Sequence, residues 1–160
     1  MIIEISMMPN TLEEFISMPL MDLSIAENTC IMFLCALELF IKNRDEGLEA
    51  MNILRGPRPM NGFDVQFLGD RLRGKTYLPK AYFKGASPNN GYEASKPYRL
   101  ELSRDIRNQE PGYLKLFLKT EGADLKRPIT LRKKGESWYL WEYSSILSGI
   151  RLPKEEDPWA

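Results

Sequence analysis

Residues 25–42 predict a helix that is apolar on nearly every side, and no other segment constrains the fold as strongly. A helix with so little polar surface has to be packed against other elements on several faces. We therefore expect it at the centre of the molecule, with Ser24 and Glu27 forming a capping box at its start. The apolar positions are Cys30, Ile31, Met32, Phe33, Leu34, Cys35, Ala36, Leu37, Leu39, Phe40 and Ile41.

Shorter helical patterns lie on both sides of this segment. Thr11 and Glu14 fit a capping box for a helix over residues 12–18. Gly56 and Pro57 end a second pattern, over residues 45–55. A further helix is expected over residues 63–72, and we expect its apolar stripe to face the core. The inward positions of that stripe are Phe63, Val65, Phe67, Leu68 and Leu72.

The hydrophobic period changes from 3.6 to 2 after Gly74. Four alternating segments then predict strands, and a turn at residues 134–136 links the last two into a hairpin. Residues 1–6 read as a short β-like lead-in. The sequence thus predicts an α+β fold in which N-terminal helices pack on one face of a C-terminal four- to five-stranded antiparallel sheet. The alternating segments are residues 98–103, 112–119, 128–133 and 137–143.

The length of 160 residues fits a single domain over residues 1–160, with a compact core over 11–153 and a frayed tail over 154–160. Cys30 and Cys35 are five residues apart on the expected helix, so they point in different directions and are poorly placed to form a disulfide. They are expected to pack as small apolar residues, which suits a reducing cytoplasm. The longest apolar run, residues 30–37, is too short to cross a membrane.

The charges balance overall but divide along the chain. Residues 1–70 carry 4 basic and 11 acidic side chains, whereas residues 71–160 carry 18 basic and 11 acidic ones. Such halves can attract each other within one fold or present opposite faces to partners.

The chain contains no histidine. This excludes nucleophile–histidine chemistry and the common histidine zinc motifs. Glycine-rich phosphate loops and calcium loops are also missing, so we expect no metal and no cofactor. Glu38 interrupts the apolar helix and is the best candidate for a carboxylate with a raised pKa. Asp64 and Asp70 lie on different faces of their helix and make a poor catalytic pair.

Cations and aromatic side chains alternate on the expected sheet, where they can serve as binding contacts or as an ordinary solvated face. Tyr113, Lys115 and Phe117 fall on one face by alternation. The connector over residues 82–92 is a second candidate, unless its aromatic side chains plug the core. The candidate binding residues are Tyr82, Phe83, Tyr92, Tyr113, Lys115, Phe117, Arg132, Trp138, Trp141 and Tyr143.

Three segments, residues 77–88, 112–119 and 127–151, resemble an uncharacterised domain family of Firmicutes bacteria. The resemblance covers about residues 11–153 and implies a bacterial domain of unknown function. Helices followed by a sheet that ends in Gly-Glu-Ser-Trp-Tyr-Leu, residues 135–140, are also similar in layout to nuclear-transport-factor-2-like cone folds. That likeness implies a cone-shaped pocket but fixes no function.

Three functions remain open. The residues best fit a non-catalytic module that binds an unidentified protein or peptide through its sheet face, because aromatic and arginine side chains anchor such interfaces. The first alternative is a cone-fold enzyme that binds a small molecule and uses a carboxylate or tyrosine. The second is a nucleic-acid-binding domain that uses the basic, aromatic sheet face. The oligomeric state is left open.

Overall fold

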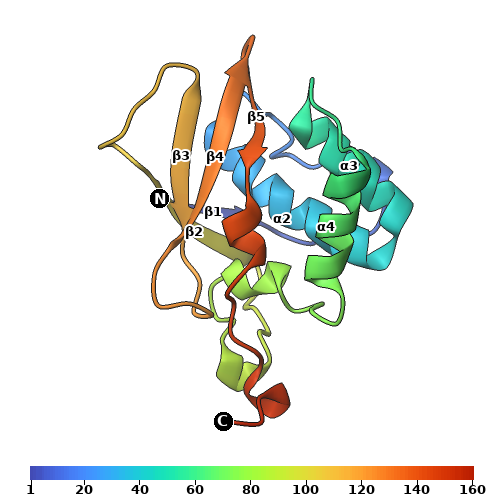
Figure 1. Ribbon diagram of the computed structural model, residues 1–160, viewed down its shortest axis with the longest axis vertical. Helices are drawn as coiled ribbons and strands as arrows, with labels where there is room; N and C mark the ends of the chain where they lie inside the picture. Colours follow the sequence, from blue (N-terminus) through green and yellow to red (C-terminus); the bar gives the residue numbers. More distant parts are fainter.

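The structure, a computed structural model that describes residues 1–160, places four α-helices before most of the sheet (Figure 1). Three of the expected helices begin within one residue of the predicted start and end where predicted. The first is shorter than predicted, because Ser17 caps it. The helices are α1 (Leu12–Ile16), α2 (Ala26–Lys42), α3 (Arg44–Arg55) and α4 (Gly62–Leu72).

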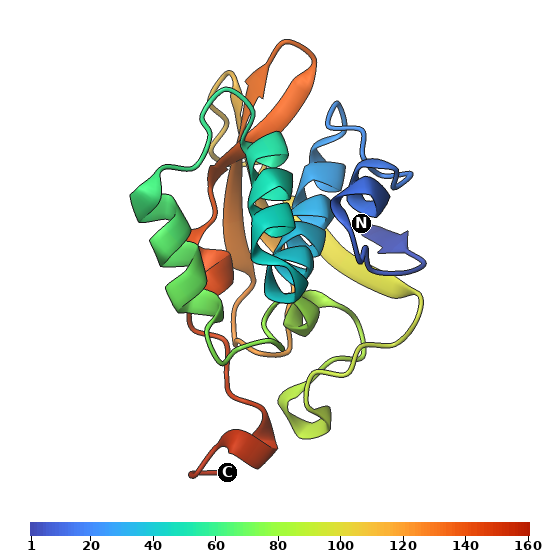
Figure 2. The same ribbon diagram turned by 90° about the vertical axis from the view of Figure 1, so that its right-hand side faces the viewer.

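Helix α2 is the centre of the core, as its apolar sequence predicts. All of its residues from 26 to 40 are buried. Figure 2 shows α2 and α3 side by side in front of the sheet, with α4 on one side of them and α1 on the other. Helix α2 therefore contacts α1, α3 and the sheet, and this is why nearly its whole circumference is apolar.

The sheet is antiparallel throughout and follows the order β1-β2-β3-β4-β5. Leu116, Leu118 and Leu131 on its inner face are fully buried. Figure 1 shows the sheet curling around the helices, with β1 and β2 crossing below the long β3 and β4. The predicted α+β class is confirmed. The strands are β1 (Ile2–Ile5), β2 (Tyr98–Arg104), β3 (Tyr113–Leu118), β4 (Arg127–Lys134) and β5 (Ser137–Glu142).

Two details of the helices differ from the sequence prediction. The side chains of Ser24 and Glu27 do not cap α2, whose N-cap residue is Ile25. The Ser24 hydroxyl instead donates to Asp22, and Glu27 accepts two hydrogen bonds from Arg104. A reciprocal capping box does form at α4, where Asn61 and Asp64 bond to each other's backbone N–H groups.

Phe63 also departs from the prediction that it faces the core. It lies in the first turn of α4 and is 77% exposed, whereas Leu68 and Leu72 of the same helix are buried. Phe63 precedes Leu68 by five residues, which places the two side chains about 140° apart around the helix. Phe63 therefore points away from the buried stripe and lines an open hollow instead.

The connector between α4 and β2 is packed rather than open. It contains two short 3₁₀ helices, η1 (Pro79–Tyr82) and η2 (Pro88–Asn90). A short 3₁₀ turn, η3 (Ser144–Leu147), follows β5, and another, η4 (Lys154–Glu156), lies near the end of the chain. None of the helices has the length and apolar character that a membrane crossing requires.

Candidate functional site

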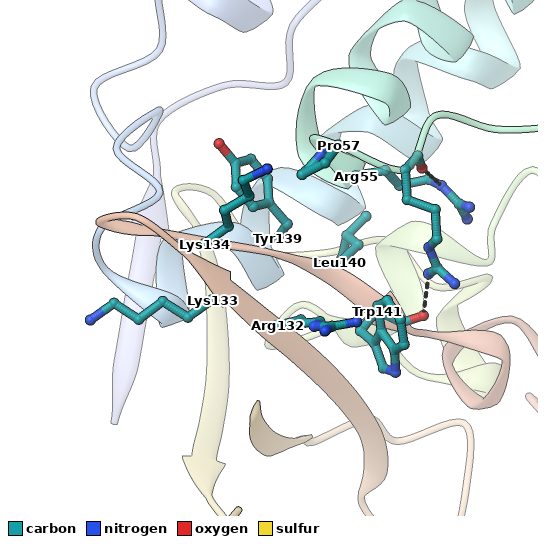
Figure 3. Close-up of a pocket in the computed structure, with 9 residues that line it drawn as sticks. Arg55, Pro57, Arg132, Lys133, Lys134, Tyr139, Leu140 and Trp141 are labelled. Carbon is teal, nitrogen blue, oxygen red and sulfur yellow. Dashed lines mark hydrogen bonds between the residues drawn. The ribbon is translucent and has the colours of Figure 1, made fainter. Parts of the chain in front are cut away.

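A hollow lined by cations lies between the loop after α3 and the β4–β5 hairpin (Figure 3). Its volume is about 450 Å³, and it is open to solvent. Five of the nine residues that line it are lysine or arginine, and none is acidic. We call it the cationic groove. Its lining residues are Arg55, Pro57, Arg58, Arg132, Lys133, Lys134, Tyr139, Leu140 and Trp141.

The indole of Trp141 organises two of these cations. The Cζ atom of Arg58 lies 4.2 Å from the ring centroid, and that of Arg132 lies 4.5 Å from it. Arg132 also lies 5.2 Å from the ring of Tyr113, which meets Trp141 edge-on at 5.9 Å. Cation–π contacts of this kind hold guanidinium groups in place and leave their edge N–H groups free to bind a ligand.

A β-bulge explains why Trp141 reaches both arginines. Leu131 of β4 pairs with Leu140 of β5, but the next β4 residue, Thr130, pairs with Glu142. Trp141 is therefore the extra residue on β5. A bulge of this kind redirects a side chain and bends the strand. Here it accompanies the approach of the indole to the loop after α3.

Arg55 fixes that loop from beneath. It is 5% exposed, and each of its nitrogen atoms has a partner. Its Nε donates to the Arg58 carbonyl oxygen at 2.9 Å, Nη1 to the Tyr143 hydroxyl at 2.8 Å and Nη2 to the Asp64 carboxylate at 3.1 Å. Because Arg55 is buried and each of its side-chain nitrogen atoms already donates a hydrogen bond, it positions Arg58 rather than serving as a ligand contact itself.

Gly56 allows the loop to approach β5. Its φ is +61°, a conformation that favours glycine. A Cβ atom at this position would lie 2.5 Å from the ring of Tyr139, well inside van der Waals contact. The close packing of the Gly56 backbone on the Tyr139 ring thus sets one wall of the cationic groove.

Arg55 pairs with Asp64, but the other four cations of the groove form no ion pair. Arg58, Arg132, Lys133 and Lys134 take part in none of the seven salt bridges of the structure. The other end of the sheet differs, because Glu101 there pairs with both Lys84 and Lys119. The unpaired cations of the groove therefore come from β4 and from the loop after α3.

The structure brings three of the predicted binding residues together: Tyr113, Arg132 and Trp141. Lys115 and Phe117 lie farther along the same face of β3, as alternation predicts, with the Lys115 amine 5.6 Å from the Phe117 ring. Trp138 lies on the inner side of β5 against the core, with Lys133 over its ring.

Four other predicted binding residues are in the interior and are not placed to contact a partner. Tyr82 and Phe83 are each 2% exposed, and Tyr92 is 1% exposed. The hydroxyl groups of the two tyrosines serve the fold, because Tyr82 donates to the Ile146 carbonyl and Tyr92 to the Arg151 carbonyl. The connector aromatics thus plug the core, which was the alternative to a ligand-facing loop. Tyr143 is also buried, against Phe33 and Arg55.

The candidate list missed the part of the groove that lies outside the sheet. Arg58 is the main omission, because it follows α3 and lies 83 positions before Trp141. The pattern Arg-Gly-Pro-Arg at residues 55–58 marked a helix end with two cations. Nothing in that pattern indicated which strand the loop would contact. Lys134 and Tyr139 are a cation and an aromatic residue in the predicted hairpin, but neither was included among the candidate binding residues.

Neither of the carboxylates considered for catalysis lines the cationic groove. Glu38 is 4% exposed within α2, where burial raises its pKa, and its Oε1 atom has no hydrogen-bond partner. Asp64 is held by Arg55 and by its capping role.

Cys30 and Cys35 are fully buried free thiols with pKa values raised by burial. No three His, Cys, Asp or Glu side chains are grouped so that they could hold a metal ion.

Comparison with known proteins identifies a family. A protein-family model described as "Domain of unknown function (DUF6935)" matches residues 7–154. No curated protein and no solved structure is significantly similar to the chain. The match extends from the loop after β1 through every other strand and all four α-helices, and it includes the whole cationic groove. The chain therefore belongs to the DUF6935 family of domains of unknown function.

Proposed function

We propose that this domain is a non-catalytic binding module that takes an acidic segment of a partner protein into the cationic groove. One observation carries the proposal: four cations without ion pairs line the groove, and the indole of Trp141 holds two of them, Arg58 and Arg132, in place. Side chains held in this way lose little conformational entropy on binding. An acidic segment would supply the carboxylates that these cations lack.

A second hollow adjoins the groove and extends the surface. Its volume is about 260 Å³, and it shares Arg55, Arg58 and Trp141 with the groove. Phe63 and Phe67 form its apolar side, and Phe63 is highly exposed. A partner segment that carries an apolar residue next to its acidic ones would cover both hollows. Exposed aromatic side chains beside arginines are typical anchors of protein interfaces.

Nucleic acid remains the competing ligand, because the same cations can bind phosphates. Single-stranded nucleic acid is usually held by stacking its bases on open aromatic faces. Trp141 already has two guanidinium groups against its ring, and Tyr113 has one. This arrangement favours a ligand that binds the guanidinium edges, as carboxylates do.

The cone-fold enzyme is less well supported than a binding module. Such an enzyme needs a carboxylate or tyrosine that is free in an open cavity. Asp64 is bonded to Arg55 and caps α4, and Glu38 is enclosed by the core.

We propose that the protein is located in the cytoplasm of a Firmicutes bacterium. The motif resemblance implies the source, and two free buried thiols suit a reducing compartment.

Fluorescence anisotropy with two labelled probes tests the proposal. One probe is a peptide of alternating glutamate and leucine, and the other is single-stranded oligothymidine of similar length. We expect the peptide to bind and Arg132→Ala to weaken it by about tenfold or more, since a hydrogen bond to a charged group contributes about 1.5–3 kcal/mol. Lys126→Ala removes an exposed cation outside the groove and serves as the matched control.

The competing outcomes are distinct. Nucleic acid would be favoured if oligothymidine binds and the peptide does not. The logarithm of the oligothymidine binding constant should then fall with the logarithm of the salt concentration, with a slope of about −0.7 for each phosphate neutralised. Equal peptide affinities for Arg132→Ala and Lys126→Ala would contradict the groove as the binding site.

A further inference from the structure

The two edge strands of the sheet, β1 and β5, differ in whether another segment of the chain covers them. Strand β5 forms one edge, and the segment leading into α2 covers it. The Trp138 N–H donates to the Leu23 carbonyl at 2.7 Å, and the Trp138 carbonyl accepts from the Thr29 hydroxyl at 2.8 Å. Strand β1 forms the other edge and pairs only with β2.

The backbone of β1 presents hydrogen-bonding groups on its open side. Met1 and Leu102 exchange two hydrogen bonds, of 3.1 and 3.0 Å. Bonded and non-bonded pairs alternate along an antiparallel ladder. Ile3 and Ile5 therefore bond to β2 like Met1, while the N–H and C=O groups of Ile2 and Glu4 point away from it.

A hollow of about 350 Å³ lies at the end of β1, where Glu4 and Ile5 line it together with the segment after β1 and the end of α1. Its apolar lining is rich in methionine, an unbranched residue that adapts to varied partners. Met7 is 63% exposed, and Ile16 nearby on α1 is 51% exposed. We call this hollow the β1 groove. Its apolar lining includes Met7, Met8, Met18, Pro9, Pro19 and Leu20.

The β1 groove is acidic where the first groove is basic. Glu4 and Glu14 line it, and no lysine or arginine does. The first 41 residues of the chain contain no lysine or arginine at all. Arg99 stands opposite Glu4 in the β1–β2 register, but no salt bridge joins them. A charged residue on an edge strand discourages pairing with chains that do not complement it.

We propose that the β1 groove binds an extended, basic segment of a partner protein by strand addition to β1. The segment forms main-chain hydrogen bonds with Ile2 and Glu4. Its apolar side chains enter the methionine-lined hollow, and its lysine or arginine side chains lie beside Glu4 and Glu14. Main-chain bonds supply affinity in this mode of recognition, and side-chain pockets supply specificity.

This site is independent of the cationic groove. It lies at the opposite edge of the sheet, shares no lining residue with that groove and selects the opposite charge. Failure of one proposal therefore leaves the other standing.

Amide hydrogen exchange on the unmodified protein gives the direct test. The probe is a capped hexapeptide of alternating valine and lysine, and the matched control probe replaces each lysine with glutamate. We expect the lysine peptide to slow exchange at the Ile2 and Glu4 amides by about tenfold at saturation, with Ile3 and Ile5 changing far less. Unchanged exchange at Ile2 and Glu4 with millimolar lysine peptide would overturn the proposal.

Two substitutions at one position separate the backbone contact from the charge. Glu4→Pro removes the edge-facing N–H and keeps the β2 ladder, since proline is tolerated on an edge strand. Glu4→Gln removes only the charge. We expect the proline variant to bind the lysine peptide about threefold to tenfold more weakly than the glutamine variant, the effect of one lost hydrogen bond. Equal affinities would refute strand addition.

A second copy of this chain is the other occupant of the β1 edge that has to be tested. Sedimentation of the protein alone gives its mass without peptide. A dimer that dissociates in Glu4→Pro would assign the edge to a second copy and refute the basic partner. A monomer whose edge amides are protected only by the lysine peptide supports it.

Discussion

The Arg58 guanidinium is attached to Trp141 in two ways, through the ring and through the backbone. Its Cζ lies 4.2 Å from the indole centroid, and its Nη2 donates a 2.6 Å hydrogen bond to the Trp141 carbonyl oxygen. The contact ties the loop after α3 to the bulged end of β5. The cationic groove is therefore formed before any ligand arrives, and the residues that support this contact determine its shape.

Arg55→Ala should destabilise the domain strongly. The substitution leaves Asp64 and the Tyr143 hydroxyl without their partner and frees the carbonyl of Arg58. Removing one member of a buried ion pair costs about 3–5 kcal/mol, and we expect about 2–3 kcal/mol here because Asp64 is partly exposed. Urea denaturation gives the free energy of unfolding. Arg73→Ala, which breaks an exposed pair with Asp70, should cost less than about 1 kcal/mol.

Gly56→Ala should narrow the groove as well as strain the backbone. The new Cβ would lie 2.5 Å from the Tyr139 ring, so either the loop or the ring has to move. Gly74→Ala is the matched control, because Gly74 has a similar φ of +68° but open space around its Cβ position. The left-handed α conformation costs about 1–2 kcal/mol for alanine, and Gly56, with a ψ of −120°, lies outside even that region. We expect a larger loss for Gly56→Ala in thermal unfolding, and equal losses would mean that the Tyr139 contact is unimportant.

Leu34→Ala should show how much stability depends on α2. The side chain is fully buried, and its removal should cost about 2–5 kcal/mol, including the cavity left behind. The comparison is Phe63→Ala, a larger truncation at an exposed position, which should change stability by about 0.5 kcal/mol or less. Chemical denaturation of both variants decides. A loss below about 1 kcal/mol for Leu34→Ala would contradict the central packing of α2.

Glu38 and Glu27, both in α2, should respond to pH in opposite directions. Burial raises the pKa of Glu38 above its ordinary value of 4.5, despite the nearby charges of Lys80 and Lys42. The folded state then holds a proton that the unfolded state releases, so Glu38 lowers stability as the pH rises above about 4.5. Glu38→Gln should therefore stabilise the protein at pH 7, and this gain should disappear below pH 4.5.

Glu27→Gln should do the reverse. The hydrogen bonds from Arg104 lower the pKa of Glu27, and this outweighs its burial. Its ionised form stabilises the folded state above pH 4.5, and that contribution is lost as the pH falls through the lowered pKa. The variant should be less stable than the parent at pH 7, with the gap closing in acid. Thermal unfolding across pH 3–8 checks both variants, and slopes of the same sign would contradict the assignment.

The fold was largely predictable because its signals are local. The apolar circumference of α2 and the alternation along β3 each follow from neighbouring residues, as does the shared face of Tyr113, Lys115 and Phe117. Local patterns gave the wrong hydrogen-bond partner where a side chain bonds to a residue far away in the sequence. Glu27 looked like a cap for α2, but Arg104, 77 positions away, binds it instead.

The candidate site was only half predictable for the same reason. Arg132 and Trp141 could be assigned to neighbouring strands, and their aromatic and cationic character was visible in the sequence. The approach of Arg58 depends on where the end of α3 lies over β5, which no local pattern specifies. In the connector, the sequence suggested binding residues where the structure has core residues. Tyr82 and Tyr92 were predicted to contact a partner, but both side chains are buried in the interior.

The strand order also has a consequence for how the chain folds. Strands β2 to β5 pair with their sequence neighbours, so each pairing closes only a short loop. The β1–β2 pairing instead joins Ile5 to Tyr98 and encloses all four α-helices. Long closures of this kind slow folding, since their entropy is lost before the contacts form. During synthesis β1 therefore stays unpaired until all four α-helices and β2 have been made.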